Sequence, residues 1–117
     1  ESGEKITLVG KDVDTVEACG GFKDEDVANL VELDELSEGS ILHHVRKRFN
    51  RGVIYTNVGN ILVSVNPFRS LPIYSNQVMT YYHSVRGEEG EPHVFAVAAR
   101  AYDLLVRERR NQSILIR

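Results

Sequence analysis

The chain has 117 residues, of which 42% are hydrophobic, and its formal net charge is −3 at pH 7. This length suits one small domain or a piece of a larger one, and the slight acidity excludes bulk electrostatic attraction to nucleic acid or anionic membranes. A single cysteine, Cys19, excludes an internal disulfide. We therefore expect a cytoplasmic protein of a reducing compartment, and we expect no membrane span because no apolar run approaches ~20 residues.

The first 21 residues predict a small β segment. Two short strands, Ile6–Val9 and Val13–Val16, are joined by Gly10–Asp12, which suits a hairpin turn. Gly20-Gly21 is the best candidate for a linker to the rest of the chain.

Two helices are predicted next. The acidic residues 24–26 suit the positive end of a helix dipole, which favours a short helix through Val27 and Val31. A clearer helix is expected to start at Ser40 and to end at residues 50–52. Its apolar residues recur on one face and its basic residues lie largely on the other: Ile41, Leu42, Val45 and Phe49 against Arg46, Lys47 and Arg48.

A β-hairpin is predicted from strands at residues 53–56 and 61–65 around a turn at 57–60. The second strand is apolar almost throughout, which predicts burial on both faces and a core completed by other sequence or by a partner.

Two further helices and a last strand are predicted after the hairpin. Ser75 is expected to cap the first helix, whose Val78, Tyr81, Tyr82 and Val85 recur at helical spacing. Pro92 suits the first position of a helix that runs to about Arg109. Residues 113–116 favour a final strand.

The loop between the hairpin and the helices, residues 66–74, is the most informative segment and reads Asn-Pro-Phe-Arg-Ser-Leu-Pro-Ile-Tyr. Its two prolines each fix φ near −65°, so little backbone entropy remains to be lost. Such a loop is either a rigid connection with surface aromatics or a grip for a flat heteroaromatic ring. In the second case Tyr and Phe supply surface, while Asn and the Tyr hydroxyl supply hydrogen bonds.

This loop closely resembles the adenine-side loop of the myosin motor head. Flanking segments resemble the same family in the same order, so the similarity covers residues from about 25 to 116. These segments are the early helices at 31–49, the hairpin at 52–65, and the helix and strand that lead to the phosphate loop at 92–96 and 111–116.

The resemblance implies an α/β fold: a mixed α+β fragment from the N-terminal part of a P-loop motor core. It divides the chain into the end of a small β-barrel-like segment at 1–21 and an incomplete motor domain at 22–117. Five loop residues would contact adenine and its ribose: Asn66, Pro67, Phe68, Arg69 and Tyr74.

An intact relative would use ATP and Mg²⁺ and would move along the actin filament as a cytoskeletal motor. It would also need a loop of the form Gly-x-x-x-x-Gly-Lys-Ser/Thr for the phosphates. The sequence contains no such loop, and Arg117 stands where the family usually has a small hydroxyl residue. We therefore expect this chain alone to be inactive and to bind no nucleotide tightly, with the remainder of the motor head as its partner.

An alternative of another class is a stand-alone, non-enzymatic interaction domain that binds a protein through its uncapped sheet edge. A weaker alternative is that two basic clusters bind a polyanion. The simpler interpretation of these clusters is that they are solvated helix faces. These clusters lie at residues 46–51 and 107–110. We predict no catalytic residue and no metal site, because the histidines lack Cys or carboxylate partners at ligand spacing and suit structural or solvent-facing roles: His43, His44, His83 and His93.

Overall fold

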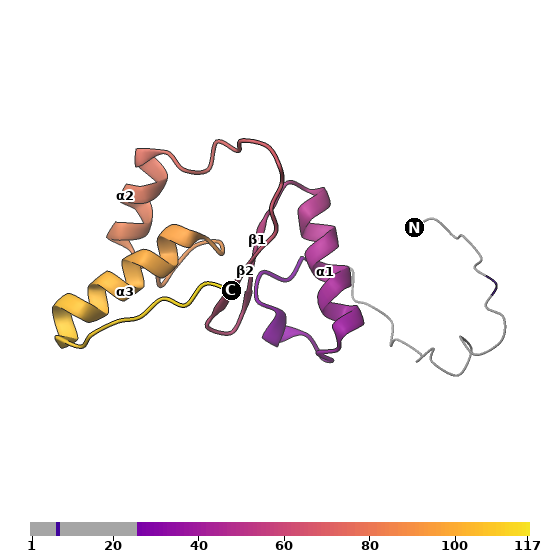
Figure 1. The fold of residues 1–117 in the computed structure, drawn as a ribbon, viewed down its shortest axis with the longest axis horizontal. Coiled ribbons are helices and arrows are strands. Elements are labelled where there is room, and N and C mark those ends of the chain that lie inside the picture. Colours follow the sequence, from indigo (N-terminus) through magenta and orange to yellow (C-terminus); the bar gives the residue numbers. More distant parts are fainter. Residues whose placement is uncertain (1–6, 8–25) are drawn as a thin grey trace.

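A computed structural model describes residue 7 and residues 26–117 of the chain. Its described part combines three α-helices, one 3₁₀ turn and one β-hairpin (Figure 1), which is the mixed α and β content expected. The predicted strands at 6–9 and 13–16, the linker at 20–21 and Cys19 lie outside the described residues. The elements are η2 (Leu30–Glu32), α1 (Glu38–Asn50), β1 (Tyr55–Val58), β2 (Ile61–Ser64), α2 (Asn76–Ser84) and α3 (Val94–Glu108).

The segment before α1 forms a 3₁₀ turn where a short α-helix was predicted. Its backbone pairs with the hairpin, since the Asn57 N–H donates to the Ala28 carbonyl at 2.9 Å and Asn29 forms a parallel bridge with Asn57. The Asn29 side chain also accepts a hydrogen bond from the Gly59 N–H at 2.9 Å. A backbone committed to strand-like pairing cannot continue as a helix, so the prediction for this segment is wrong.

Helix α1 begins earlier than predicted because Ser37, not Ser40, is its N-cap. Ser37 and Ser40 each accept a hydrogen bond from the other's backbone N–H, at 3.2 and 2.9 Å, which makes a capping box. The buried face of α1 is also polar, since it consists of Ser40, His44 and Arg48 at a spacing of four residues. Arg48 was predicted to lie on a solvated helix face, and its burial shows that this prediction is wrong.

The hairpin is confirmed, with a tighter turn than predicted. Val58 pairs with Ile61, so only Gly59 and Asn60 remain in the turn. Gly59 has a φ of +59°, which glycine adopts at little cost. Expected burial of residues 61–65 on both faces is wrong, because Ile61 is 66% exposed and the described sheet has only two strands.

Helices α2 and α3 lie side by side, on the far side of the hairpin from α1 (Figure 1). Ser75 caps α2 as predicted, accepting a hydrogen bond from the Val78 N–H. A glycine lets the two helices approach: a Cβ on Gly87 would lie 2.1 Å from the Ala96 carbonyl oxygen, and its φ of +69° also favours glycine. Pro92 is not the first helical residue, because His93 is the N-cap of α3.

Residues 109–117 form no strand, although a strand was predicted at 113–116. The segment runs back from α3 toward the hairpin (Figure 1), and its side chains at 114–116 are exposed. A strand needs a neighbour for its backbone hydrogen bonds, and the sheet of the described residues contains β1 and β2 alone.

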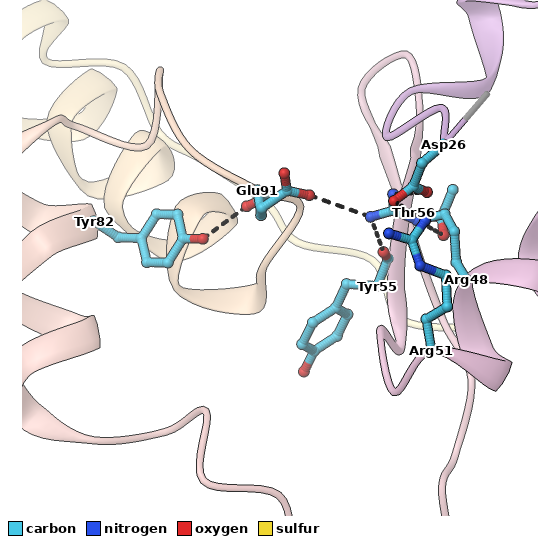
Figure 2. Close-up of polar contacts among 7 residues, drawn as sticks. All are labelled: Asp26, Arg48, Arg51, Tyr55, Thr56, Tyr82 and Glu91. Atoms are coloured by element: carbon cyan, nitrogen blue, oxygen red, sulfur yellow. Dashed lines mark hydrogen bonds and ion pairs between the residues drawn. The ribbon is translucent and has the colours of Figure 1, made fainter.

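A buried arginine joins the separate elements. The Arg48 guanidinium donates to Thr56 Oγ1 at 3.1 Å and to the Tyr55 carbonyl at 3.2 Å, both on β1. It also bonds Asp26 at 2.9 Å and Glu91, in the segment before α3, at 3.3 Å (Figure 2). Arg48 is 2% exposed, so these partners replace the water that a guanidinium otherwise binds.

Replacing Arg48 should therefore destabilise the chain far more than replacing its exposed neighbour Arg46. Arg48→Met leaves the Thr56 hydroxyl and the Tyr55 carbonyl without their donor, and we expect a loss of roughly 2–4 kcal/mol in the free energy of unfolding. Arg46→Met should change it by less than about 0.5 kcal/mol. Urea unfolding of the two variants measures the difference, and equal effects would contradict the role assigned to Arg48.

Candidate functional site: the proline-braced loop

The loop between β2 and α2, residues 65–75, contains no helix or strand and crosses from the hairpin to the α2–α3 pair (Figure 1). At its start, Asn66 Oδ1 accepts a hydrogen bond from the Phe68 N–H at 2.8 Å. This local bond supports Phe68 at a φ of +51°, a left-handed conformation that is uncommon for residues other than glycine. The Phe68 side chain is 92% exposed.

The hydrogen bond made by Asn66 determines which of its side-chain groups remain available to a ligand. Its oxygen is engaged within the loop, whereas its amide nitrogen keeps two hydrogens to donate. Asn66 is exposed, so those donors are accessible to a ligand.

Residues of the loop line a cavity of about 290 Å³. Small-molecule pockets usually start near ~300 Å³, so the cavity suits one ring system better than a whole nucleotide. It brings together three of the five predicted site residues, while Asn66 and Phe68 lie outside it. The lining residues are Pro67, Arg69, Ser70, Leu71 and Tyr74.

Tyr74 connects the cavity to the interior. Its hydroxyl lies 2.9 Å from the hydroxyl of Tyr55, the first residue of β1. Tyr55 is 8% exposed and Tyr74 is 50% exposed, so the pair spans from the buried hairpin to the surface. Burial and the hydrogen bond to Tyr74 raise the pKa of Tyr55 to about 12.

His93 fixes the other side of the loop. Its Nδ1 accepts the N–H of Phe95 at 3.0 Å and thereby caps α3. Because Nδ1 accepts, the ring hydrogen is on Nε2, which donates to the Ile73 carbonyl at 3.0 Å. Burial lowers the pKa of His93, partly offset by the bond to the Ile73 carbonyl, so the neutral ring is favoured.

Aromatic rings surround this histidine. Tyr82 of α2 stacks on the His93 ring, with centroids 5.0 Å apart and planes 11° apart. Tyr55 meets the same ring edge-on at 5.2 Å, and Tyr74 lies tilted against it at 5.7 Å. The end of the loop is thus packed on a cluster drawn from β1, α2 and α3.

Sequence reasoning missed the residues that hold the loop: Tyr55, His93 and the Ile73 carbonyl. The histidines were expected to be structural or solvent-facing, and nothing in the sequence singled out His93 among them. A usable signal was its position directly after Pro92 and before a helical pattern, where a side-chain cap is needed.

None of the described helices has the length and the apolar character that a membrane span requires. No cluster of three or more His, Cys, Asp or Glu side chains in residues 26–117 is arranged to hold a metal ion.

Known proteins with similar sequences identify the class to which this chain belongs. Residues 27–117 match the family Myosin head (motor domain). The chain is 40% identical over 116 residues to the high molecular weight form of myosin-1 of Acanthamoeba castellanii. It is 37% identical over 115 residues to a non-muscle myosin heavy chain of Drosophila melanogaster, and 42% identical over 92 residues to myosin-2 of Arabidopsis thaliana.

The aligned regions cover 99%, 98% and 79% of this chain, but only 7%, 5% and 7% of those relatives. The chain belongs to the myosin head family, which confirms the resemblance, and it spans a small part of the length of its relatives.

The neutral state of His93 predicts a loss of stability in mild acid. The unfolded histidine has its ordinary pKa of 6.5 and the folded one a lower pKa, so below pH 6.5 the unfolded chain takes up the proton first. The free energy of unfolding should be constant above about pH 6.5 and fall as the pH drops through the lowered pKa. Urea unfolding between pH 7.5 and 5.5 measures this.

A His93→Gln variant is the control for that series. It should be less stable at pH 7.5, because the α3 cap and the Ile73 bond change, and its stability should decline less steeply in acid. Some decline should remain, because burial, together with the charges of His43 and Lys47, also lowers the pKa of His44. An unchanged pH slope in the variant would contradict the assignment to His93.

Proposed function

We propose that this chain supplies the adenine-side wall of the ATP pocket in a myosin motor head. Asn66, Pro67, Phe68, Arg69 and Tyr74 are its contacts to adenine and the ribose. The cavity at Pro67, Arg69 and Tyr74 is the observation that carries this proposal, since it has the size for a ring system and lies on a loop fixed to the core.

The available polar groups fit a purine. The Asn66 amide donates to an acceptor of the base or sugar, and the Tyr74 oxygen accepts from the exocyclic amine of adenine. The Phe68 ring and the proline face supply apolar surface. Arg69 is exposed and lines the cavity, where its guanidinium offers hydrogen-bond donors to the base or the ribose.

In the intact motor this wall belongs to a P-loop core that binds ATP with Mg²⁺. The phosphates and the metal need backbone N–H groups, a lysine and a hydroxyl residue from a phosphate loop, which this sequence does not contain. The partners of the segment are therefore the remainder of the motor head and, through it, the actin filament. ATP-driven movement on the actin cytoskeleton is the activity we propose for the whole head.

A stand-alone interaction domain is the second candidate, and exposed apolar side chains favour it. Ile61 on the hairpin is 66% exposed, and Ile114, Leu115 and Ile116 are 57–89% exposed. Exposed apolar residues in one region mark interaction surfaces. The rest of a motor head would cover the same surface, so the two candidates differ in whether the loop contacts nucleotide.

Replacing Tyr74 in a complete motor head that contains this sequence separates these candidates. Tyr74→Ala removes the ring and hydroxyl at the cavity, and we expect the Kd for Mg·ATP to rise by about 10-fold or more. Tyr102→Ala, an exposed tyrosine of α3 outside the loop, is the matched control and should leave the Kd unchanged. Equal ATP affinity in both variants would refute the adenine contact and favour the interaction domain.

The 117-residue chain by itself should release no phosphate from ATP, because charge-assisted contacts to the phosphates and Mg²⁺ supply most of the positioning and affinity. A sensitive phosphate-release assay on the purified chain tests this, with Tyr74→Ala protein as the background. Turnover above that background would show that the chain carries chemistry we have not assigned.

A further inference from the structure

We infer that Tyr55 is a positioning residue for the adenine base, which it aligns through the hydroxyl of Tyr74. This inference rests on the proposed function and adds a residue outside the loop to it. Among the five proposed contacts, Tyr74 is the one whose side chain hydrogen-bonds outside the loop in the described structure, and Tyr55 is its partner at 2.9 Å.

Tyr55 is itself held at both ends. Its carbonyl accepts a hydrogen bond from the buried Arg48 guanidinium at 3.2 Å (Figure 2), and its ring packs edge-on against His93. Tyr55 also begins β1, where it pairs with Ser64 in the hairpin. Its hydroxyl therefore projects from a fixed backbone and a fixed ring.

The burial of the two tyrosines sets the direction of the bond. Tyr55 is 8% exposed, and its hydroxyl has no other partner among the described residues, so its hydrogen has one acceptor, the Tyr74 oxygen. Tyr74 is half-exposed, and its own hydrogen can reach solvent. Donation from Tyr55 to Tyr74 thus satisfies both groups, whereas the reverse direction leaves the buried Tyr55 hydrogen without an acceptor.

Donation from Tyr55 to Tyr74 leaves the Tyr74 oxygen able to accept a hydrogen bond from a purine. A phenolic oxygen has two acceptor positions; Tyr55 occupies one, and the other stays open toward the cavity for the exocyclic amine. Without the Tyr55 hydroxyl, the Tyr74 side chain keeps only its packing against His93 and Phe95, with centroids 5.7 and 6.1 Å apart. Binding of the base would then have to order the Tyr74 side chain, and the entropy lost would weaken the affinity.

Tyr55→Phe tests the inference, because it removes the hydroxyl and keeps the ring. In a complete motor head that contains this sequence, we expect the Kd for Mg·ATP to rise about 3- to 10-fold, the effect of one hydrogen bond. The Kd for Mg·pyrophosphate, which has no base, should stay within about 1.5-fold, and its binding shows in the same samples that the head is folded. In a Tyr74→Phe head, adding Tyr55→Phe should have no further effect on ATP binding, because Tyr55 acts through that hydroxyl.

Tyr102→Phe is the matched control. It also removes one phenol hydroxyl, but from an exposed tyrosine of α3 that lies outside the loop and outside the ring cluster around His93. Its ratio of ATP to pyrophosphate affinity should equal that of the unmodified head.

The other possible outcomes distinguish failure of the inference from failure of the proposed function. Equal weakening of ATP and pyrophosphate by Tyr55→Phe would show a general structural effect and overturn the inference. Unchanged ATP binding in Tyr55→Phe, with weak binding in Tyr74→Ala, would overturn the inference and leave the proposed function standing. Unchanged ATP binding in Tyr74→Ala would overturn both.

Discussion

The loop and the helices around it depend on the contacts that the neutral ring of His93 makes. One ring nitrogen caps α3 at the Phe95 N–H, and the other donates to the Ile73 carbonyl. Tyr82 of α2 stacks on the same ring, and Tyr55 of β1 meets its edge. Since Ile73 immediately precedes Tyr74, this one side chain determines where the proposed adenine contact emerges from the core. A charged ring would lose the cap, because a protonated Nδ1 cannot accept.

Polar side chains make up much of the remaining interior, and this fits a segment that belongs to a larger head. The described residues bury Ser40, His44, Arg48, Thr56 and His93 beside a few apolar side chains. Every buried side-chain nitrogen and oxygen in this part of the chain has a hydrogen-bond partner. Removing one member of such a network leaves its buried partners without a hydrogen bond, so the network favours one arrangement of these elements. Arg48 links α1, β1 and the segment before α3 in this way, while the apolar residues at 114–116 remain exposed.

The sequence predicted the elements whose signals are local. Helical spacing and Ser75 located α2, the apolar pattern around Gly59 located the hairpin, and the linked motifs identified the family. It failed where a distant partner decides the outcome. Residues 27–31 had helix signals, but the backbone of Ala28 and Asn29 pairs with β1. Arg48 has the sequence pattern of a surface residue, and it is buried because Asp26 and Glu91, far apart in sequence, both bond it. The loop was predicted as a stiff segment from its prolines, but its attachment through Tyr55 and His93 depends on contacts far apart in sequence.

The position of the ring hydrogen on His93 can be measured in solution. Long-range ¹H–¹⁵N NMR of the histidine rings at pH 7 distinguishes the two neutral forms from the charged one. We predict that His93 carries its hydrogen on Nε2, with Nδ1 unprotonated, as the bonds to the Ile73 carbonyl and the Phe95 N–H require. A hydrogen on Nδ1, or a charged ring at this pH, would contradict the account, because the α3 cap and the anchor of the loop could not then exist together.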